Sequence, residues 1–157
     1  MKIESFLAAR EELGFLLWGG LIRVDGKIIW SGAECVGRGP KFSVELAQYD
    51  GAVLILKKLQ GLKAQHPESS ISLITDNQAL VERLKGQWAQ YAVALDQAID
   101  LVRSLDDLVL RYCERRANQP AHELITALCK AHRVPVREHY RRPWKENADD
   151  TQRQRER

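Results

Sequence analysis

The sequence lacks long apolar runs, has few cysteines, and carries no excess of one charge in its main body. No stretch approaches the roughly 20 consecutive apolar residues that span a bilayer, and the start lacks the basic-then-apolar order of a secretory signal peptide. Of the 157 residues, 45% are hydrophobic and 29% are charged, which is typical of one compact folded domain. We therefore expect a cytoplasmic globular protein.

The three cysteines, Cys35, Cys113 and Cys129, are odd in number, widely separated and set in apolar surroundings. They do not form the CxxC pairs of zinc sites or the dense framework of a disulfide-rich domain. We expect reduced thiols in the core and no metal binding through sulfur.

The net charge of +3 lies entirely after residue 132, and residues 1–132 are electrically balanced. A broadly basic face that grips a phosphate backbone is therefore not expected in the main body. Residues 133–157 are polar and show no apolar period, which predicts a mobile C-terminal tail after a folded domain of residues 1–132. The tail either contributes to nucleic-acid affinity or only aids solubility.

Apolar periodicity predicts the order of strands and helices. Two runs, 15–24 and 27–36, flank Asp25-Gly26, a strong hairpin signal, and Trp18 and Trp30, one on each run, are expected to form a cross-strand pair. A hairpin followed by alternating strands and helices predicts an α/β fold with a mixed five-stranded sheet and helices on both faces. Helices are expected at 44–62, 77–86, 88–105 and 120–132, and further strands at 71–75 and within 107–115.

Asp76 stands directly after the apolar run "SLIT" and directly before a helical pattern. In open α/β sheets, functional sites form at the carboxyl ends of strands, so this carboxylate is a candidate for chemistry. Asp is also a common helix N-cap. Taken alone, Asp76 fits the capping role better.

Three segments together change this interpretation. "LITDNQALVERLKGQWAQYAVAL" (73–95), "AQYDGAVLILKKL" (47–59) and "RANQPAHEL" (116–124) resemble motifs of the ribonuclease H family, in the family's order and spacing. The resemblance covers roughly residues 15–132 and implies the family's fold.

The resemblance also implies a mechanism, in which four carboxylates hold two Mg²⁺ or Mn²⁺ ions that cut the RNA strand of an RNA/DNA hybrid. Asp76 matches the acid at the strand end. Gln48 stands where the family has Glu, and His122 stands where it has Asp. Asp76 and Gln48 are the candidate metal ligands, because such ions prefer oxygen donors.

The fourth acid belongs on the first central strand of the family fold, and Glu4 is its candidate here. "ESFLAAREEL" (4–13) fits an amino-terminal helix at least as well, and we slightly favour the helix. Glu45 and Glu123 lie beside Gln48 and His122 in the sequence, so they are alternative acids for a rearranged site.

The motifs also indicate candidate nucleic-acid contacts. Lys41 closes "GRGPK", which either cradles a phosphate or forms an ordinary turn, and Trp88 is the aromatic side chain expected near Asp76. The remaining candidates belong to the motifs themselves: Asn77, Arg116 and Asn118.

Three functions remain open at this stage. The first is a ribonuclease H-like domain that binds nucleic acid, by resemblance RNA/DNA hybrid, with hydrolysis weak or lost. The second is an active hybrid ribonuclease that uses Mg²⁺ or Mn²⁺ with Asp76 and Glu4, Glu45 or Glu123. The third is a non-catalytic protein-interaction module of the same fold. The missing carboxylate charge favours the first.

Overall fold

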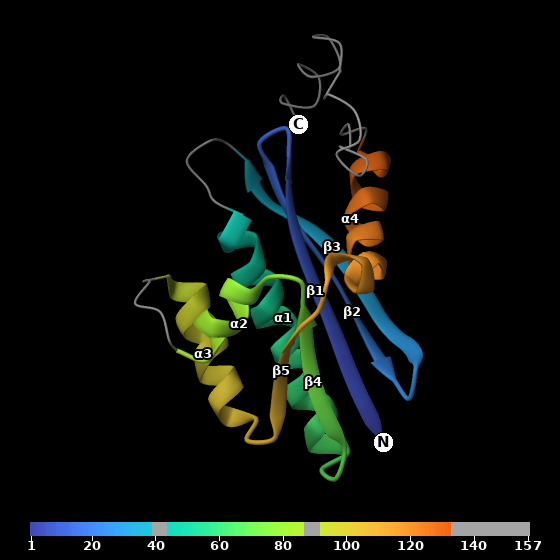
Figure 1. The fold of residues 1–157 in the computed structure, drawn as a ribbon, viewed down its shortest axis with the longest axis vertical. Coiled ribbons are helices and arrows are strands. Elements are labelled where there is room, and N and C mark those ends of the chain that lie inside the picture. The colour runs from blue at the N-terminus through green and yellow to red at the C-terminus, as the bar shows by residue number, and fades with distance from the viewer. Residues whose placement is uncertain (39–43, 87–91, 133–157) are drawn as a thin grey trace.

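The computed structural model describes residues 1–38, 44–86 and 92–132. They form one five-stranded sheet in the order β3-β2-β1-β4-β5 (Figure 1). The strands are β1 (Lys2–Glu12), β2 (Phe15–Val24), β3 (Lys27–Arg38), β4 (Ser70–Thr75) and β5 (Leu108–Tyr112). The helices are α1 (Val44–Gln65), α2 (Gln78–Leu84), α3 (Val93–Ser104), the short 3₁₀ helix η1 (Arg115–Asn118) and α4 (Gln119–Ala131).

The sheet is mixed, as the sequence predicted. β2 pairs antiparallel with β1 and β3, whereas β4 lies parallel to both β1 and β5. Val24 pairs with Lys27 across the hairpin, and Asp25 and Gly26 between them have φ of 50° and 84°. A two-residue turn with two positive φ values matches the right-handed twist of its strands, so the Asp-Gly signal is confirmed.

The first segment is a strand, so the favoured amino-terminal helix is wrong. β1 lies at the centre of the sheet, between β2 and β4. Its side chains alternate between the two faces, and both faces are largely buried. Arg10 and Glu12 take two of the buried positions on one face as an ion pair, with Nε and Oε1 3.4 Å apart. These charges hid the two-residue period of the strand.

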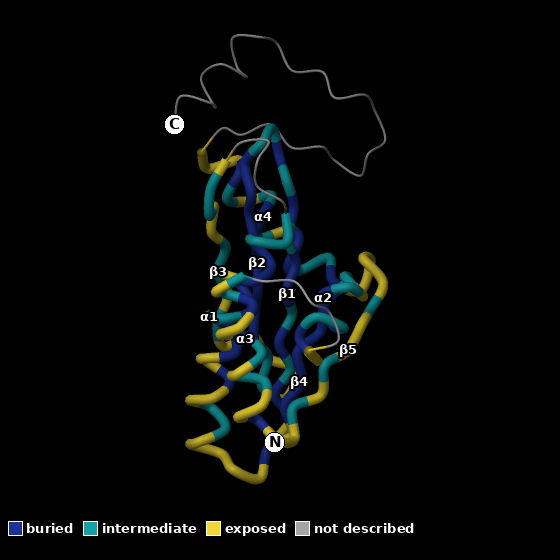
Figure 2. Tube along the Cα trace, turned by 90° about the vertical axis from the view of Figure 1, so that its left-hand side faces the viewer, coloured by how far each residue is buried: buried dark blue, intermediate teal, exposed yellow. Residues whose placement is uncertain are grey.

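Helices cover both faces of the sheet. α1 packs on one face and α3 packs on α1, while α4 lies on the opposite face over β1, β2 and β3 (Figure 1). The α1 face forms the larger core, and a smaller core lies under α4, around Leu17 and Ile125. The strands are mostly buried, and exposed residues gather on the outer sides of the helices and on β3 and β5 (Figure 2).

The expected pairing of Trp18 with Trp30 is wrong. Trp18 pairs with Glu34, and Trp30 pairs with Ile22. Trp18 lies seven residues before Asp25, whereas Trp30 lies only four residues after Gly26, so the two-residue turn already places them out of register. A β-bulge adds one more residue to the mismatch, because Ile22 pairs with Trp30 while Arg23 pairs with Ile28, leaving Ile29 as an extra residue.

The cysteines are all free, and only Cys129 is fully buried, while Cys35 is exposed on β3. The prediction of core thiols is therefore wrong for Cys35, which lies on an edge strand. Among the described residues, no helix is both long and apolar enough to cross a membrane.

Gly19 sets how closely α4 approaches the sheet. A Cβ at this position would lie 2.5 Å from the carbonyl oxygen of Ala121 and 2.9 Å from Cγ1 of Ile125. We expect Gly19→Ala to lower the free energy of unfolding by about 1–3 kcal/mol, because it overpacks this contact. Urea unfolding measures the change. Gly61→Ala in α1 is the matched control, because its new Cβ would meet nothing within 4 Å. Equal losses in both variants would contradict the close approach.

Candidate functional site

Asp76 directly follows β4, at the end of the sheet where functional groups were expected. It does not cap the next helix, so the simpler interpretation is wrong. Asn77 is the N-cap of α2, and its Oδ1 accepts a hydrogen bond from the backbone N–H of Leu80 at 3.0 Å. The Asp76 side chain is thus available for other contacts, and it is 13% exposed.

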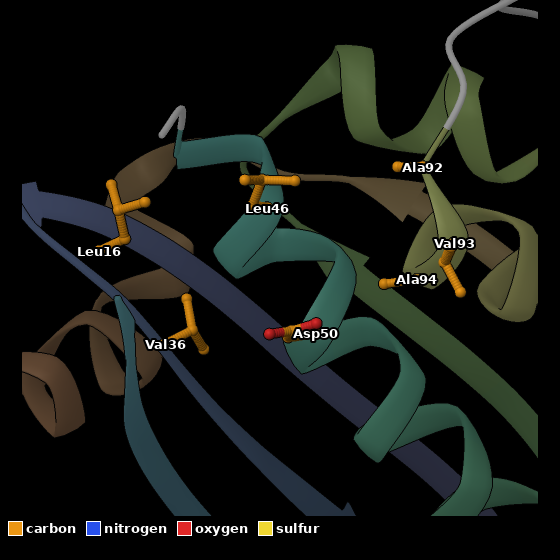
Figure 3. Close-up of a pocket in the computed structure, with 7 residues that line it drawn as sticks. All are labelled: Leu16, Val36, Leu46, Asp50, Ala92, Val93 and Ala94. Atoms are coloured by element: carbon orange, nitrogen blue, oxygen red, sulfur yellow. The ribbon is translucent and has the colours of Figure 1, made fainter. Parts of the chain in front are cut away.

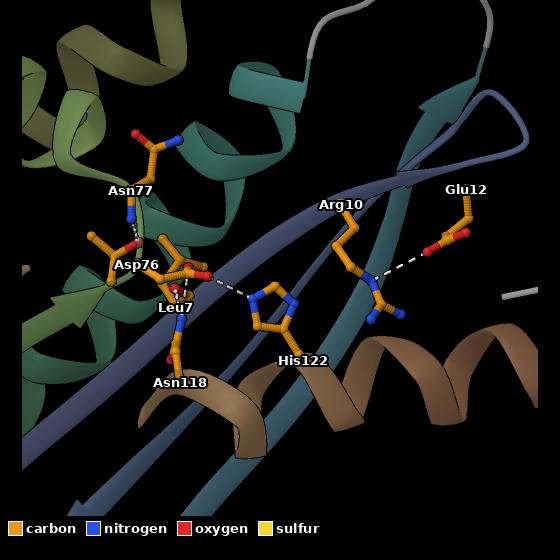
Figure 4. A network of polar contacts seen from close by, with 8 residues as sticks. Leu7, Arg10, Glu12, Asp76, Asn77, Asn118 and His122 are labelled. Atoms are coloured by element: carbon orange, nitrogen blue, oxygen red, sulfur yellow. Dashed lines mark hydrogen bonds and ion pairs between the residues drawn. The ribbon is translucent and has the colours of Figure 1, made fainter. Parts of the chain in front are cut away.

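His122 in the first turn of α4 contacts Asp76 directly. Its Nε2 lies 2.8 Å from Oδ2 of Asp76 (Figure 4). An ionised carboxylate only accepts hydrogen bonds, so Nε2 carries the hydrogen. The His122 side chain is 2% exposed. The prediction that Asp76, Gln48 and His122 converge at one end of the sheet is confirmed for Asp76 and His122.

Asn118 occupies the other oxygen of the same carboxylate. Its Nδ2 donates to Oδ1 of Asp76 at 3.0 Å and to the carbonyl oxygen of Leu7 at 2.8 Å (Figure 4). Asn118 is completely buried. One amide therefore joins β1, the residue after β4 and the start of α4, and both oxygens of Asp76 accept hydrogen bonds.

The pKa of Asp76 reflects opposing influences. Burial raises it, but the hydrogen bond and electrostatic interaction with His122, the hydrogen bond from Asn118 and a backbone N–H together outweigh burial. The net result is a pKa below the ordinary value of 3.8. Asp76 therefore remains a carboxylate at neutral pH, stabilised by donors from within the protein.

The structure does not bring Glu4 to this site. Glu4 pairs with Ser72, four residues before Asp76 along parallel strands, which corresponds to roughly 13 Å. Its carboxylate lies 3.6 Å from the ammonium group of Lys2. Leu7 pairs with Thr75, so the residue of β1 beside Asp76 is Ala8.

Ala8 is a position that the sequence analysis missed. It is 1% exposed and packs in the core under α4. Treating residues 2–12 as a central strand would have allowed "FLA" (6–8) to be aligned with "ITD" (74–76), and the alternation of Phe6, Ala8 and Arg10 was the available signal. At the position on the first strand where an acid was expected, this chain therefore has the methyl side chain of Ala8.

Within the described residues, no other candidate acid joins Asp76 in a group that could hold a metal, and Gln48 stands in the place of an acid. Gln48 is 5% exposed, and its Oε1 is buried without a hydrogen-bond partner among the described residues. Oε1 of Glu45 lies 3.9 Å from Nη1 of Arg83. Glu123 is exposed although its neighbour His122 is buried, because consecutive residues point about 100° apart around a helix.

The donor set does not fit the two divalent ions that the fold family implies. Mg²⁺ needs several hard oxygen ligands, preferably charged, whereas the side chains that contact the Asp76 carboxylate present the amide nitrogen of Asn118 and the imidazole of His122. Both oxygens of the carboxylate already accept hydrogen bonds. Across residues 1–38, 44–86 and 92–132, no three His, Cys, Asp or Glu side chains form a group that could hold a metal.

The candidate nucleic-acid contacts divide by exposure. Asn118 is inside the protein, so contact with a ligand is excluded in this conformation, and Asn77 serves as a helix cap. The Arg116 side chain is 93% exposed on η1, between β5 and α4, with Glu114 4.0 Å away. Lys41 and Trp88 lie outside the described residues.

Two further features lie outside the contacts of Asp76. Beside His122, Nη2 of buried Arg10 donates to Oγ1 of Thr126 at 2.9 Å, and burial raises the pKa of the nearby Cys129 thiol to about 11.

A groove of about 410 Å³ opens on the α1 face (Figure 3), and burial raises the pKa of its Asp50 carboxyl although that residue still reaches solvent. The groove is lined by Leu16, Val36, Leu46, Asp50, Ala92, Val93 and Ala94, and includes no residue of the Asp76 site.

We expect Asp76→Asn to lower the free energy of unfolding by about 1–3 kcal/mol at neutral pH, because it weakens charge-assisted hydrogen bonds. The folded-state pKa is lowered, so the stabilisation is complete above the ordinary value of 3.8 and is lost as pH falls through the folded-state value. Unfolding at several pH values should therefore show the two chains converging in acid. Asp106→Asn, at an exposed aspartate, is the control. A difference that is independent of pH would contradict the charge argument.

Neither the scan against family models nor the search of curated proteins finds a match for this chain. Solved structures do match. Ribonuclease H1 from the halophilic archaeon Halobacterium salinarum NRC-1 is 21% identical, with a TM-score of 0.65, and the match covers 83% of this chain and 99% of that one.

Two further structures agree. The N-terminal ribonuclease H domain of a Mycobacterium tuberculosis protein is 16% identical, with a TM-score of 0.64 over 79% of this chain and 95% of that one. LC11-RNase H1, in complex with an RNA/DNA hybrid, is 19% identical, with a TM-score of 0.63 over 83% and 97%. At these identities the likeness concerns architecture, and it agrees with the strand order and helix placement above. The chain has a ribonuclease H-like fold.

Proposed function

We propose that this chain is a ribonuclease H-like domain that binds nucleic acid, with RNA/DNA hybrid as the expected ligand, and that its hydrolytic activity is weak or lost. The observation that carries the proposal is the state of Asp76. Its two oxygens accept hydrogen bonds from His122 and Asn118, and its neighbour on β1 is Ala8.

Hydrolysis by two metal ions needs negative charge that holds both ions at once. Here Gln48 and Ala8 contribute no charge, and His122 directs an N–H group at the remaining carboxylate. An ion that approached Asp76 would have to displace this hydrogen bond, and it would find no second carboxylate nearby. Mg²⁺ or Mn²⁺ is therefore a cofactor only of the alternative, active form.

That alternative would require acids to move into the site. Glu45 would have to leave Arg83, and Glu123 would have to turn from solvent towards the core. Glu4 would need β1 to shift by four residues against β4, which would break the present pairings of β1 with both β2 and β4. Each change breaks contacts that the fold already makes, so we favour binding without efficient cleavage.

Support for nucleic-acid binding comes from the surface next to the site. Arg115 and Arg116 lie on η1, which connects β5 to α4 at the same end of the sheet as Asp76. Guanidinium groups there can contact phosphates, and such contacts supply most of the affinity in non-specific binding. The structural neighbour LC11-RNase H1 is itself in complex with an RNA/DNA hybrid.

We expect the unmodified chain to show no efficient cleavage of an RNA/DNA hybrid in Mg²⁺, since one carboxylate cannot hold two ions. The triple change Ala8→Asp, Gln48→Glu and His122→Asp should create Mg²⁺ binding that calorimetry detects in the variant alone. It should also lower stability without metal and recover it with Mg²⁺, because ligand binding stabilises only the folded state.

The double change Gln48→Glu with His122→Asp is the matched control for the Ala8 position, and we expect weaker Mg²⁺ binding than in the triple variant. Asp76→Asn added to the triple variant should abolish binding. Robust Mg²⁺-dependent cleavage by the unmodified chain, lost in Asp76→Asn, would show that the site is catalytic and would refute the proposal.

We expect Arg116→Ala to weaken hybrid binding and to reduce the slope of log affinity against log salt by about 1, because one phosphate contact is lost. Fluorescence anisotropy at several salt concentrations measures both quantities. Lys57→Ala, at an exposed position of α1, removes the same charge elsewhere and should change neither. A chain that binds no hybrid even at low salt would rule out the binding function.

A further inference from the structure

β3 is an edge of the sheet, and within the described residues no strand pairs with its outer side. It is 12 residues long, and it exposes two large apolar side chains, Ile28 (51% exposed) and Ile29 (50% exposed). Long apolar edge strands present unpaired backbone groups that recruit another strand unless they are blocked. By contrast, β5 at the opposite edge has only 5 residues.

The bulge in β3 gives its outer edge an unusual pattern. In a regular strand, residues seven apart point to opposite faces. Ile29 is an extra residue relative to β2, so Lys27 and Glu34 both lie on the α1 face, where their partners Val24 and Trp18 pack against the larger core. Neither Lys27 nor Glu34 has an ion pair within the described part of the chain.

We propose that β3 pairs antiparallel with β3 of a second copy of this chain, about a two-fold axis that passes through Ser31. Such an axis is perpendicular to the sheet and keeps each face continuous across the interface. With Ile29 left out as the bulge, the register places Trp30 opposite Gly32 of the second copy. The next pair is Ile28 with Ala33, and Lys27 then lies opposite Glu34.

Each of these pairs is complementary. Lys27 and Glu34 bring opposite charges together twice, once at each end of the ladder. On the α1 face, the large Trp30 side chain is opposite a glycine. On the α4 face, Ile28 is opposite the small Ala33. Opposite-charge and apolar pairs directly across strands stabilise pairing, and like charges oppose it. A second copy is favoured because one bulged strand supplies both halves of this pattern. The inference is independent of the proposed function.

Charge exchange tests the register. Sedimentation velocity of the full chain, from low to high micromolar concentration, should show a concentration-dependent dimer. Lys27→Glu and Glu34→Lys should each weaken dimerisation about tenfold, because each places two like-charged pairs in the ladder. The double variant should restore the original affinity. Lys57→Glu and Glu68→Lys make the same charge changes at exposed positions elsewhere and should have no effect.

A cross-link tests the axis. In a Cys35→Ser background, Ser31→Cys should form an intermolecular disulfide when oxidised glutathione accepts the two electrons, since directly opposed residues lie within disulfide range. Val109→Cys, on the other sheet edge, should not cross-link. A chain that stays monomeric throughout, a dimer insensitive to both single charge changes, or a double variant that fails to recover the dimer would each overturn the proposal.

Discussion

The side-chain amide of Asn118 is the contact on which the geometry around Asp76 depends. β1 continues to Glu12, whereas its parallel partner β4 ends at Thr75, so within the described part of the chain this side of β1 has no strand partner beyond Leu7. Asn118 supplies the hydrogen bond that the Leu7 carbonyl would otherwise lack. A buried carbonyl without a donor is costly. The same nitrogen also donates to Asp76, so strand end, carboxylate and α4 are held together.

Much of this architecture could be predicted from the sequence. The Asp25-Gly26 hairpin, the parallel strands 71–75 and 108–112 and the place of Asp76 follow from local turn chemistry and apolar period. β1 escaped prediction because Arg10 and Glu12 are buried together as an ion pair. A prediction from the alternation of hydrophobic and polar residues assigns two such charged residues to the protein surface.

The errors at the site have related causes. The register of parallel strands depends on long-range pairing, so the sequence alone did not place Ala8 beside Asp76 or Glu4 four residues away from it. Asn118 is a polar residue of a kind that is usually exposed, and its sequence context gave no sign of burial. In the structure it is completely buried, and its amide links β1 to Asp76. The expected tryptophan pair was wrong because Trp18 and Trp30 lie at unequal distances from the Asp25-Gly26 turn, and the bulge at Ile29 shifts every later partner in β3 by one more residue.

The residues around Asp76 also bear on stability without metal. Clustered carboxylates repel one another in a partly buried place, and a nuclease accepts this cost because bound ions offset it. In this chain, an amide, a methyl group and an imidazole surround one carboxylate, and the donors that lower its pKa belong to the fold itself. Hydrogen bonds inside the protein thus supply what divalent ions would otherwise supply. The same substitutions that weaken the case for hydrolysis remove the need for metal to hold this end of the sheet together. A shared fold therefore carries no shared chemistry unless the charges at its strand ends are retained.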